Sequence, residues 1–229
     1  MTKTASTPAR RPRGSITPDK VVAAAFAVSE RDEALTFQAI GAELGAHPTA
    51  VYRHFRDKDE LMRGLVDALL REQLDELGEP RENWQDELRA IAAALYDVFL
   101  RHPQIGQYAA ARTARTEHEF RIVERLLAAL RGGGFPKREA ALCYRLFADA
   151  CLSYAALDSA FASLSPETQA GDRAAWQQEY RSLSPAEFPQ IAELAPDLPP
   201  VSERDTYLAF VDTVLFGLET RLARSTGTA

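Results

Sequence analysis

The 229-residue sequence is poor in the residue types that build several classes of protein. It has only two cysteines, Cys143 and Cys151, which excludes a disulfide scaffold and is typical of a reducing cytoplasm. Its four histidines show no metal-ligand spacing, so we predict no metal site. The longest apolar run, residues 21–28, is too short to span a membrane, and the polar N-terminus lacks a secretory signal. We therefore expect a cytoplasmic protein without membrane contact.

Motifs of the common enzyme classes are also absent. The sequence has no glycine-rich phosphate loop, nucleophile elbow or paired carboxylates. Cys143 and Cys151 would lie about 12 Å apart on one helix, at about 1.5 Å per residue, which is too far for a disulfide. We interpret them as core thiols, and we expect neither an enzyme nor a cofactor.

An excess of positive charge is missing as well, since 27 basic and 33 acidic residues give a net charge of −6. This balance argues against a protein that coats nucleic acid. The distribution is nevertheless uneven. Residues 1–58 have a net charge of +3, whereas the remaining 171 residues have a net charge of −9. Such asymmetry favours one segment that meets a polyanion, although a chance fluctuation of surface charge would look similar.

What the sequence does contain is helical periodicity throughout, with no strand pattern, which predicts an all-α fold. Residues 1–14 are polar and basic and are typical of a disordered arm. Thr17 and Pro18 provide the cap and first residue of a helix that runs to about residue 30. Thr36 caps the next helix, and Gly45 ends it.

Pro48 opens a third helix after a very short turn. This spacing is typical of a helix-turn-helix motif, although an ordinary helical hairpin would look alike. On the third helix Val51 and Phe55 share an apolar face, whereas hydroxyl and guanidinium groups, including Arg53, fall on the other face. A short helix that buries two apolar groups and exposes such polar groups favours a DNA-reading role.

Asp57 and Glu60 form a capping box that predicts the start of a fourth helix. Further helical patterns occupy, approximately, residues 84–101, 117–131, 137–163, 172–181, 188–194 and 203–223. The expected organisation is a basic arm (1–14), a three-helix helix-turn-helix domain (15–60), a C-terminal helical domain (61–224) and a tail (225–229).

The stretch AELGAHPTAVYRHFRDKDEL within residues 35–62 resembles the most specific block of the tetracycline-repressor (TetR) family of bacterial transcriptional regulators. The match extends over about residues 15–66, and the remainder is similar in layout. The resemblance implies a homodimer whose recognition helices enter successive major grooves of a palindromic operator in double-stranded DNA. The residues expected to contact DNA are Arg13, Thr36, Phe37, Gln38, His47, Pro48, Thr49, Ala50, Tyr52, Arg53, His54 and Lys58.

These side chains are suited to different parts of the DNA. Arg53 is suited to guanine and Gln38 to adenine, whereas Tyr52, His54 and Lys58 match family positions that contact phosphates. For His54, partial burial is an equally good interpretation. The sequence departs from the family at His47, where serine or threonine usually caps the recognition helix, and an imidazole is a poorer cap.

The resemblance also implies a dimer interface and an effector pocket. The last helix carries a double apolar row, and the long helix before it carries small residues. We place the interface at Ala155, Tyr207, Val211, Val214 and Leu218, although both helices could simply fill the core of one chain. Aromatic and polar residues between these helices and the DNA-binding domain are candidate pocket residues: Tyr96, Phe99, Gln107, Tyr108, Arg112, Phe120, Phe147, Tyr154, Asp158 and Trp176.

The sequence thus favours a DNA-binding repressor that a small apolar or amphipathic effector releases. The alternative is a helical ligand-binding or interaction module whose helix-turn-helix does not read DNA.

Overall fold

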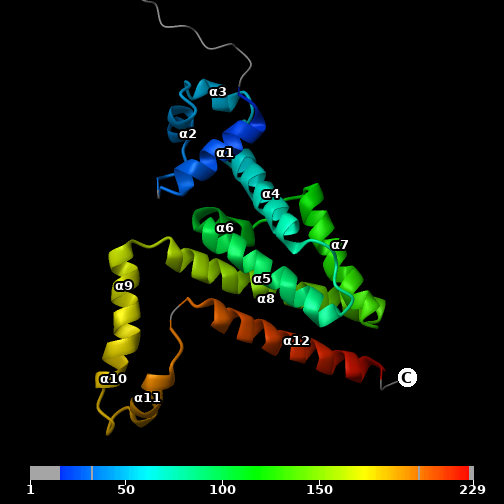
Figure 1. Cartoon of the computed structure of the whole chain (residues 1–229), viewed down its shortest axis with the longest axis vertical. Coiled ribbons are helices and arrows are strands. Elements are labelled where there is room, and N and C mark those ends of the chain that lie inside the picture. Colours follow the sequence, from blue (N-terminus) through cyan, green and yellow to red (C-terminus); the bar gives the residue numbers. More distant parts are fainter. Residues whose placement is uncertain (1–15, 32, 201, 227–229) are drawn as a thin grey trace, which may run out of the picture. The chain divides into compact units, whose positions relative to one another are not determined.

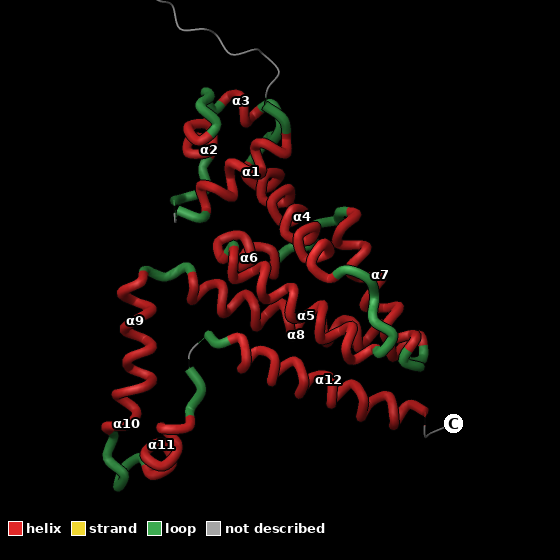
Figure 2. The backbone as a smooth tube through the Cα atoms, viewed as in Figure 1, coloured by secondary structure: helices red, strands yellow, loops and turns green. Residues whose placement is uncertain are grey.

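The computed structural model describes residues 16–31, 33–200 and 202–226, apart from the side chains of residues 176, 177 and 226. All regular elements of this part of the chain are helices (Figure 2), which confirms the all-α prediction. The chain divides into two units, the first ending at Leu61 and the second beginning at Met62.

The first unit contains α1 (Pro18–Ser29), α2 (Phe37–Glu43) and α3 (Thr49–Tyr52). The two predicted caps are present, because Thr17 Oγ1 accepts from the Lys20 backbone N–H at 3.4 Å and Thr36 Oγ1 accepts from that of Ala39 at 3.1 Å. Apolar residues from the helices and their connections form a core: Val21, Ala24, Ala25, Val28, Leu35, Ile40, Val51 and Phe55.

Two glycines shape the turn between α2 and α3. Gly45 has a φ of 61°, in the left-handed region that glycine adopts without strain. Gly41 lies on α2 where the chain returns toward it. A Cβ atom there would lie 3.0 Å from the Ala46 carbonyl oxygen and 3.2 Å from Pro48 Cα. The close approach of α2 and α3 therefore requires a residue without a side chain at position 41.

Helix α4 (Lys58–Leu77) begins in the first unit and continues into the second. Asp57 Oδ1 accepts from the Glu60 backbone N–H at 2.8 Å, as the capping-box prediction requires. The Glu60 carboxylate turns back one residue further than expected, since it accepts from the Arg56 backbone N–H at 2.7 Å. Four of the residues on α4 at intervals of four are leucines, all buried: Leu61, Leu65, Leu69 and Leu77.

The second unit is organised around α8 (Lys137–Ala162), which contacts α5 (Trp84–Arg101), α6 (Pro103–Ala110), α7 (Glu117–Gly132) and α12 (Arg204–Thr226) (Figure 1). Helix α12 extends two residues into the segment predicted as a tail. Buried side chains from these helices and their connections include Leu88, Ile91, Phe99, Ile105, Leu130, Phe135, Phe147, Tyr207 and Val211.

Between α8 and α12 the chain forms an excursion of short helices (Figure 1). It consists of α9 (Pro166–Ala174), a π-helical turn (Ala175–Glu179), α10 (Tyr180–Ser182), α11 (Pro189–Leu194) and a 3-10 turn (Ala195–Asp197). Helices α9, α10 and α11 bury none of their described residues. The two short helices predicted here are present, with the first starting earlier than expected.

Helix α8 has an apolar composition although much of its surface is exposed. By length and composition alone it is the one helix of the described chain that could cross a membrane, with a mean hydropathy of 1.2 in its most apolar window. Only 28% of that window is buried, although α8 contacts four other helices. One side of the helix therefore presents apolar side chains outward.

Candidate nucleic-acid interface and ligand cavity

Helix α3 presents its polar residues outward. Val51 is fully buried and Phe55 nearly so, and these two residues anchor the segment on the core. Thr49, Tyr52 and Arg53 are exposed, with Tyr52 at 57%. The separation of an apolar anchor from a polar outer face follows the pattern expected from the sequence.

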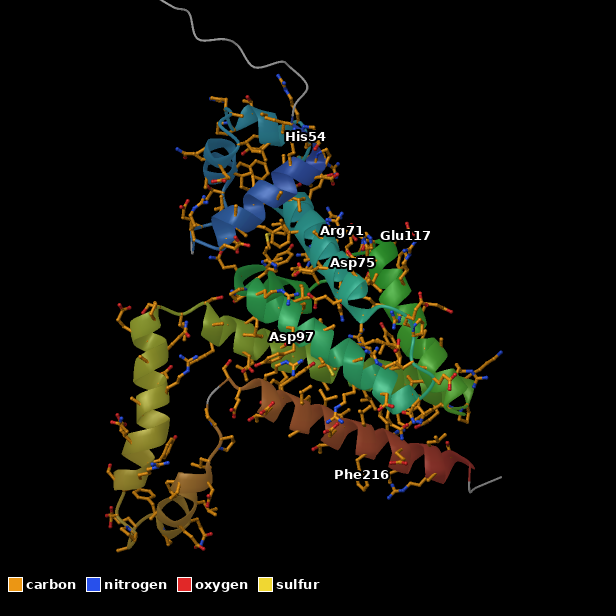
Figure 3. The ribbon with its side chains drawn as sticks, in the orientation of Figure 1. His54, Arg71, Asp75, Asp97, Glu117 and Phe216 are labelled. Atoms are coloured by element: carbon orange, nitrogen blue, oxygen red, sulfur yellow. The ribbon has the colours of Figure 1, made fainter. Side chains whose placement is uncertain are left out.

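The residues predicted at the start of α2 and around α3 lie together. One shallow groove is lined by Thr36, Phe37, Gln38, Ala42, Ala46, His47, Pro48 and Tyr52, and a neighbouring groove includes Phe37, Tyr52 and Lys58. Tyr52 packs edge-on against Phe37 with ring centroids 4.4 Å apart, so α2 holds this tyrosine in place. Ala50 and His54 (Figure 3) are half-buried beside this surface, and Arg13 lies outside the described residues.

His47 acts as a weak cap of the short α3 helix. Its Nδ1 atom accepts from the Thr49 backbone N–H at 3.4 Å and lies 3.1 Å from Thr49 Oγ1. The imidazole thus satisfies an N–H group at the helix start, where serine or threonine would do the same with better geometry. Because His47 is occupied in this way, its side chain supports α3 from within the motif.

Some cationic side chains on this surface form hydrogen bonds or ion pairs with other side chains, and others do not. Arg56 donates to the Glu60 carboxylate at 3.1 Å, and Arg31 pairs with Glu43 at 2.8 Å. Arg53 and Lys58 form no hydrogen bond or ion pair with any other described residue, and both are exposed. These two cations are therefore available to a polyanion without first breaking an internal contact.

A second candidate site is a cavity of about 120 Å³ within the second unit. It is lined by Val66, Leu70, Gln73, Ile91, Ala92, Leu95, Phe99, Ala109, Arg112, Ala114, Glu119, Ile122, Val123, Leu126, Tyr144, Phe147, Ala148, Cys151 and Leu152. Almost all of its wall is apolar, which is typical of sites for small molecules. Three predicted pocket residues, Phe99, Arg112 and Phe147, line it.

Three other predicted pocket residues form a separate cluster in which Tyr96 and Asp158 are buried and Tyr154 is half-buried. The Tyr96 hydroxyl donates to Asp158 Oδ2 at 2.7 Å, and Tyr154 and Tyr96 both pack on the ring of Tyr207. Burial raises the pKa of Asp158 above its ordinary value, although the hydrogen bond from Tyr96 opposes this effect. Asp158, which we predicted as a pocket anchor, does not line this cavity, and its carboxylate accepts a hydrogen bond from Tyr96.

The remaining predicted pocket residues also lie outside the cavity lining. Phe120 is 61% exposed on α7, since it falls on the side of the helix opposite the buried Ile122 and Leu126. Gln107 donates to Ser163 Oγ at 3.3 Å. The Tyr108 ring lies 5.7 Å from the Arg112 guanidinium, and the side chain of Trp176 is outside the described residues.

Sequence reasoning missed the contribution of α4 to the cavity. Val66, Leu70 and Gln73 come from this helix, and none of the three was among the predicted pocket residues, although the helix lies mostly in the predicted ligand-binding domain. A signal was present, because residue 73 continues the four-residue spacing of the leucine stripe. A glutamine on an apolar stripe is a candidate for a buried polar function.

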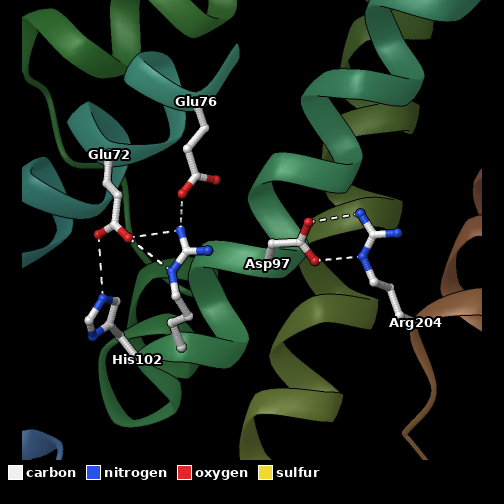
Figure 4. Close-up of polar contacts among 6 residues, drawn as sticks. Glu72, Glu76, Asp97, His102 and Arg204 are labelled. Carbon is white, nitrogen blue, oxygen red and sulfur yellow. Dashed lines mark hydrogen bonds and ion pairs between the residues drawn. The ribbon is translucent and has the colours of Figure 1, made fainter.

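Polar contacts fasten α4 to α5, to His102 between α5 and α6, and to α7. Arg101 donates to Glu72 at 3.0 Å and also pairs with Glu76, while His102 lies 3.4 Å from Glu72 (Figure 4). On the other side, His118 Nδ1 lies 2.7 Å from Asp67 Oδ1. The helix that lines the cavity is thus also tied to its neighbours at several points.

The predicted interface residues are largely inaccessible in the single chain. Ala155, Tyr207, Val211 and Leu218 are buried inside the chain's own core, and Val214 is half-buried. They face the core because α8 and α12 pack on α5 and on each other. The large apolar residues that α8 and α12 leave exposed are Leu142, Leu146, Leu157 and Phe216, and Figure 3 shows Phe216 pointing outward from α12.

A helix-turn-helix with unengaged cations, followed by a helical domain with an apolar cavity, defines a class of transcriptional regulators. A family model described as the tetracycline repressor-like C-terminal domain matches residues 77–222, and a model of bacterial regulatory proteins of the TetR family matches residues 32–65. The chain belongs to the TetR family.

Relatives and solved structures agree with this assignment. An HTH-type transcriptional regulator of Saccharopolyspora erythraea is 28% identical over 80% of this chain and 76% of the relative. The repressor DrrR1 of Streptomyces coeruleorubidus is 29% identical, but over 58% of this chain and only 50% of the relative. The fold is similar to that of the Streptomyces coelicolor protein ActR in complex with actinorhodin, with a TM-score of 0.74 at 22% identity over 91% of this chain and 99% of ActR.

A TetR protein from Acinetobacter baumannii AYE in complex with minocycline has a TM-score of 0.62 at 19% identity, and the likeness covers 91% of this chain and 99% of that protein. At these identities the structural likeness shows the fold.

Proposed function

We propose that this protein is a homodimeric repressor that binds a palindromic operator and leaves it when a small molecule occupies the second unit. The observation that carries the proposal is the surface formed by α2 and α3, where Arg53 and Lys58 are exposed and unengaged. Arginine pairs well with guanine in the major groove, and lysine suits a phosphate. The first unit has the cations for DNA even though the whole chain has a net charge of −6.

The cavity supports the effector response. It is enclosed largely by apolar side chains, and α4 supplies part of its wall. Because α4 continues into the first unit, a ligand that changes its position would act on the DNA-binding helices through the covalent chain. Such a ligand releases DNA only if it binds the released state more tightly than the bound state. ActR with actinorhodin and TetR with minocycline are ligand complexes of the same fold.

Dimerisation is supported by the outward faces of α8 and α12. Leu157 is 68% exposed and Phe216 is 71% exposed, and Leu142 and Leu146 extend this apolar surface along α8. Exposed apolar patches of this kind mark interaction surfaces. A second copy that places the same two helices against them would form a closed, two-fold symmetric interface. We assign the dimer interface to these four residues.

The test is a gel shift with the full chain and the DNA upstream of its own coding region, together with a selected random-sequence library. We expect a sequence-specific complex on a palindromic site. Failure to form any sequence-specific complex contradicts the proposal.

That failure, together with retained ligand binding, would favour the alternative of a helical ligand-binding module with a helix-turn-helix that does not read DNA. In that case any DNA affinity would be independent of sequence and would fall steeply with salt. We propose no enzymatic activity, in keeping with the regulators that this chain resembles.

A further inference from the structure

We infer that the effector is an uncharged, lipophilic molecule of about one ring that carries a hydroxyl group, and that this hydroxyl donates to Gln73 on α4. The inference deepens the proposed function and rests on it, since it names the chemistry of the molecule that the cavity admits.

Gln73 carries the argument because it is a polar group placed in an apolar wall. Its side chain is only 2% exposed and lines the cavity. The Nε2 atom donates to the Ile91 carbonyl oxygen at 3.0 Å. A carbonyl oxygen can only accept a hydrogen bond, so this contact identifies the amide nitrogen of Gln73. The amide oxygen, Oε1, is then the atom that can accept a hydrogen bond from another group. No hydrogen bond to Oε1 is present among the described residues, and Gln73 lines the cavity.

A ligand that brings a hydrogen-bond donor into the cavity would pair with Oε1. A hydroxyl group does so without charge, and burying it against an acceptor satisfies both groups. Tyr144 lines the same cavity, and its hydroxyl also has no hydrogen-bond partner among the described residues. Burial raises the pKa of Tyr144, so its hydroxyl stays protonated and offers a donor to a second polar atom of the ligand.

The charges near the cavity favour a neutral molecule. Arg112 and Glu119 both line it and have opposite signs, so neither sign of ligand charge is favoured overall. A carboxylate at Gln73 would place two acceptors against each other in a wall that is otherwise apolar. A volume of about 120 Å³ is close to that of the roughly 150 Å³ cavities that accept benzene, so one ring with a short substituent fits.

The experiment measures binding of three probes of similar size to the full chain by isothermal titration calorimetry. These are 4-ethylphenol, 1-ethyl-4-fluorobenzene, which lacks the donor, and 4-methylbenzoate, which is charged. We expect 4-ethylphenol to bind about tenfold or more tightly than either of the others, because only it satisfies Gln73. In Gln73→Met the preference of 4-ethylphenol over the fluoro compound should disappear. The control Gln107→Met removes an amide outside the cavity lining and should keep the preference.

Equal binding of 4-ethylphenol and the fluoro compound to the unmodified chain overturns the inference, as does tighter binding of the benzoate or no binding of any probe. These arms use the unmodified protein and do not depend on whether Gln73→Met folds. Release of operator DNA is measured separately by gel shift. A protein that selects 4-ethylphenol as expected but keeps its operator contradicts the proposed effector response, while the assignment of the cavity chemistry stands.

Discussion

Arg53 is the side chain whose chemistry best distinguishes DNA reading from mere attraction to a polyanion. It is exposed and forms no hydrogen bond or ion pair with another described residue, so no such interaction has to break before it meets a base. We expect Arg53→Ala to weaken specific operator binding by roughly 5- to 150-fold while changing nonspecific binding much less. Fluorescence anisotropy with operator and scrambled duplexes measures both.

Two further variants make the Arg53 experiment interpretable. Lys58→Ala should weaken binding to all sequences alike and reduce the salt slope by about 1, since it removes a phosphate contact. Arg121→Ala, an exposed arginine on α7, should change neither quantity. Equal losses on operator and scrambled DNA for Arg53→Ala would show that this arginine does not read sequence.

Asp158 predicts a pH dependence of stability. Burial raises its pKa in the folded chain above the unfolded value, so the folded state favours the protonated acid. The fold is therefore favoured below the unfolded pKa, about 3.9, and loses this stability as pH rises through the higher folded pKa. Asp158→Asn should abolish the loss and raise Tm at pH 7 by about 2–4 °C, with the Tyr96 hydroxyl donating to the amide oxygen.

Thermal unfolding between pH 4 and pH 7 measures this effect. The control is Asp149→Asn on the same helix, where the exposed carboxylate pairs with Arg145 at 2.6 Å. That variant should lack the pH-dependent gain. A lower Tm for Asp158→Asn throughout the range would mean that the ionised carboxylate stabilises the fold.

At the scale of the element, the helix-turn-helix depends on a backbone contact at Gly41. Gly41→Ala would place a Cβ atom 3.0 Å from the Ala46 carbonyl oxygen, and backbone cannot move aside as a flexible side chain can. We expect a destabilisation of about 1–3 kcal/mol and a loss of operator affinity, because α2 and α3 must separate. Circular dichroism and gel shift measure these changes.

Gly132→Ala provides the matched control, since a Cβ atom there meets nothing within 4 Å. It should be neutral or stabilising by about 0.4–1 kcal/mol. Unchanged DNA binding in Gly41→Ala would indicate that α2 and α3 tolerate a wider spacing than the structure has.

Elements with local signals could be predicted from the sequence, and elements defined by packing could not. Thr17, Thr36 and Asp57 mark helix starts because a side-chain cap acts on residues two or three positions away. The cavity depends instead on which faces of distant helices meet. Phe120 and Phe147 look alike in sequence, yet one is exposed on α7 and the other lines the cavity.

The same reason explains why most of the predicted interface residues are buried in the single chain. One side of the double apolar row on α12 packs on the chain's own core, and the other side faces outward. The periodicity of the sequence does not show which side is which. Tyr207 and Val211 belong to the inner side, whereas Phe216 belongs to the outer side.

At the scale of the whole molecule, Phe216 tests assembly. Phe216→Asp places a charge on the exposed apolar face of α12 and should weaken dimerisation by at least about 30-fold. Light scattering coupled to size-exclusion chromatography should then detect monomers. Phe120→Asp changes an equally exposed phenylalanine on α7 and should leave the dimer intact. Dimers that persist in Phe216→Asp would place the interface elsewhere.

Helix α4 has a consequence for how the regulator senses its effector. Lys58 and Gln73 both belong to helix α4, so operator and ligand would act on the same helix. Thermodynamic linkage makes their coupling reciprocal: a ligand that weakens operator binding by some factor is itself bound more weakly, by that same factor, when DNA is present. Protein on its operator is then a poorer sensor than free protein. The effector concentration needed for induction would therefore rise with operator affinity, so each promoter sets its own threshold.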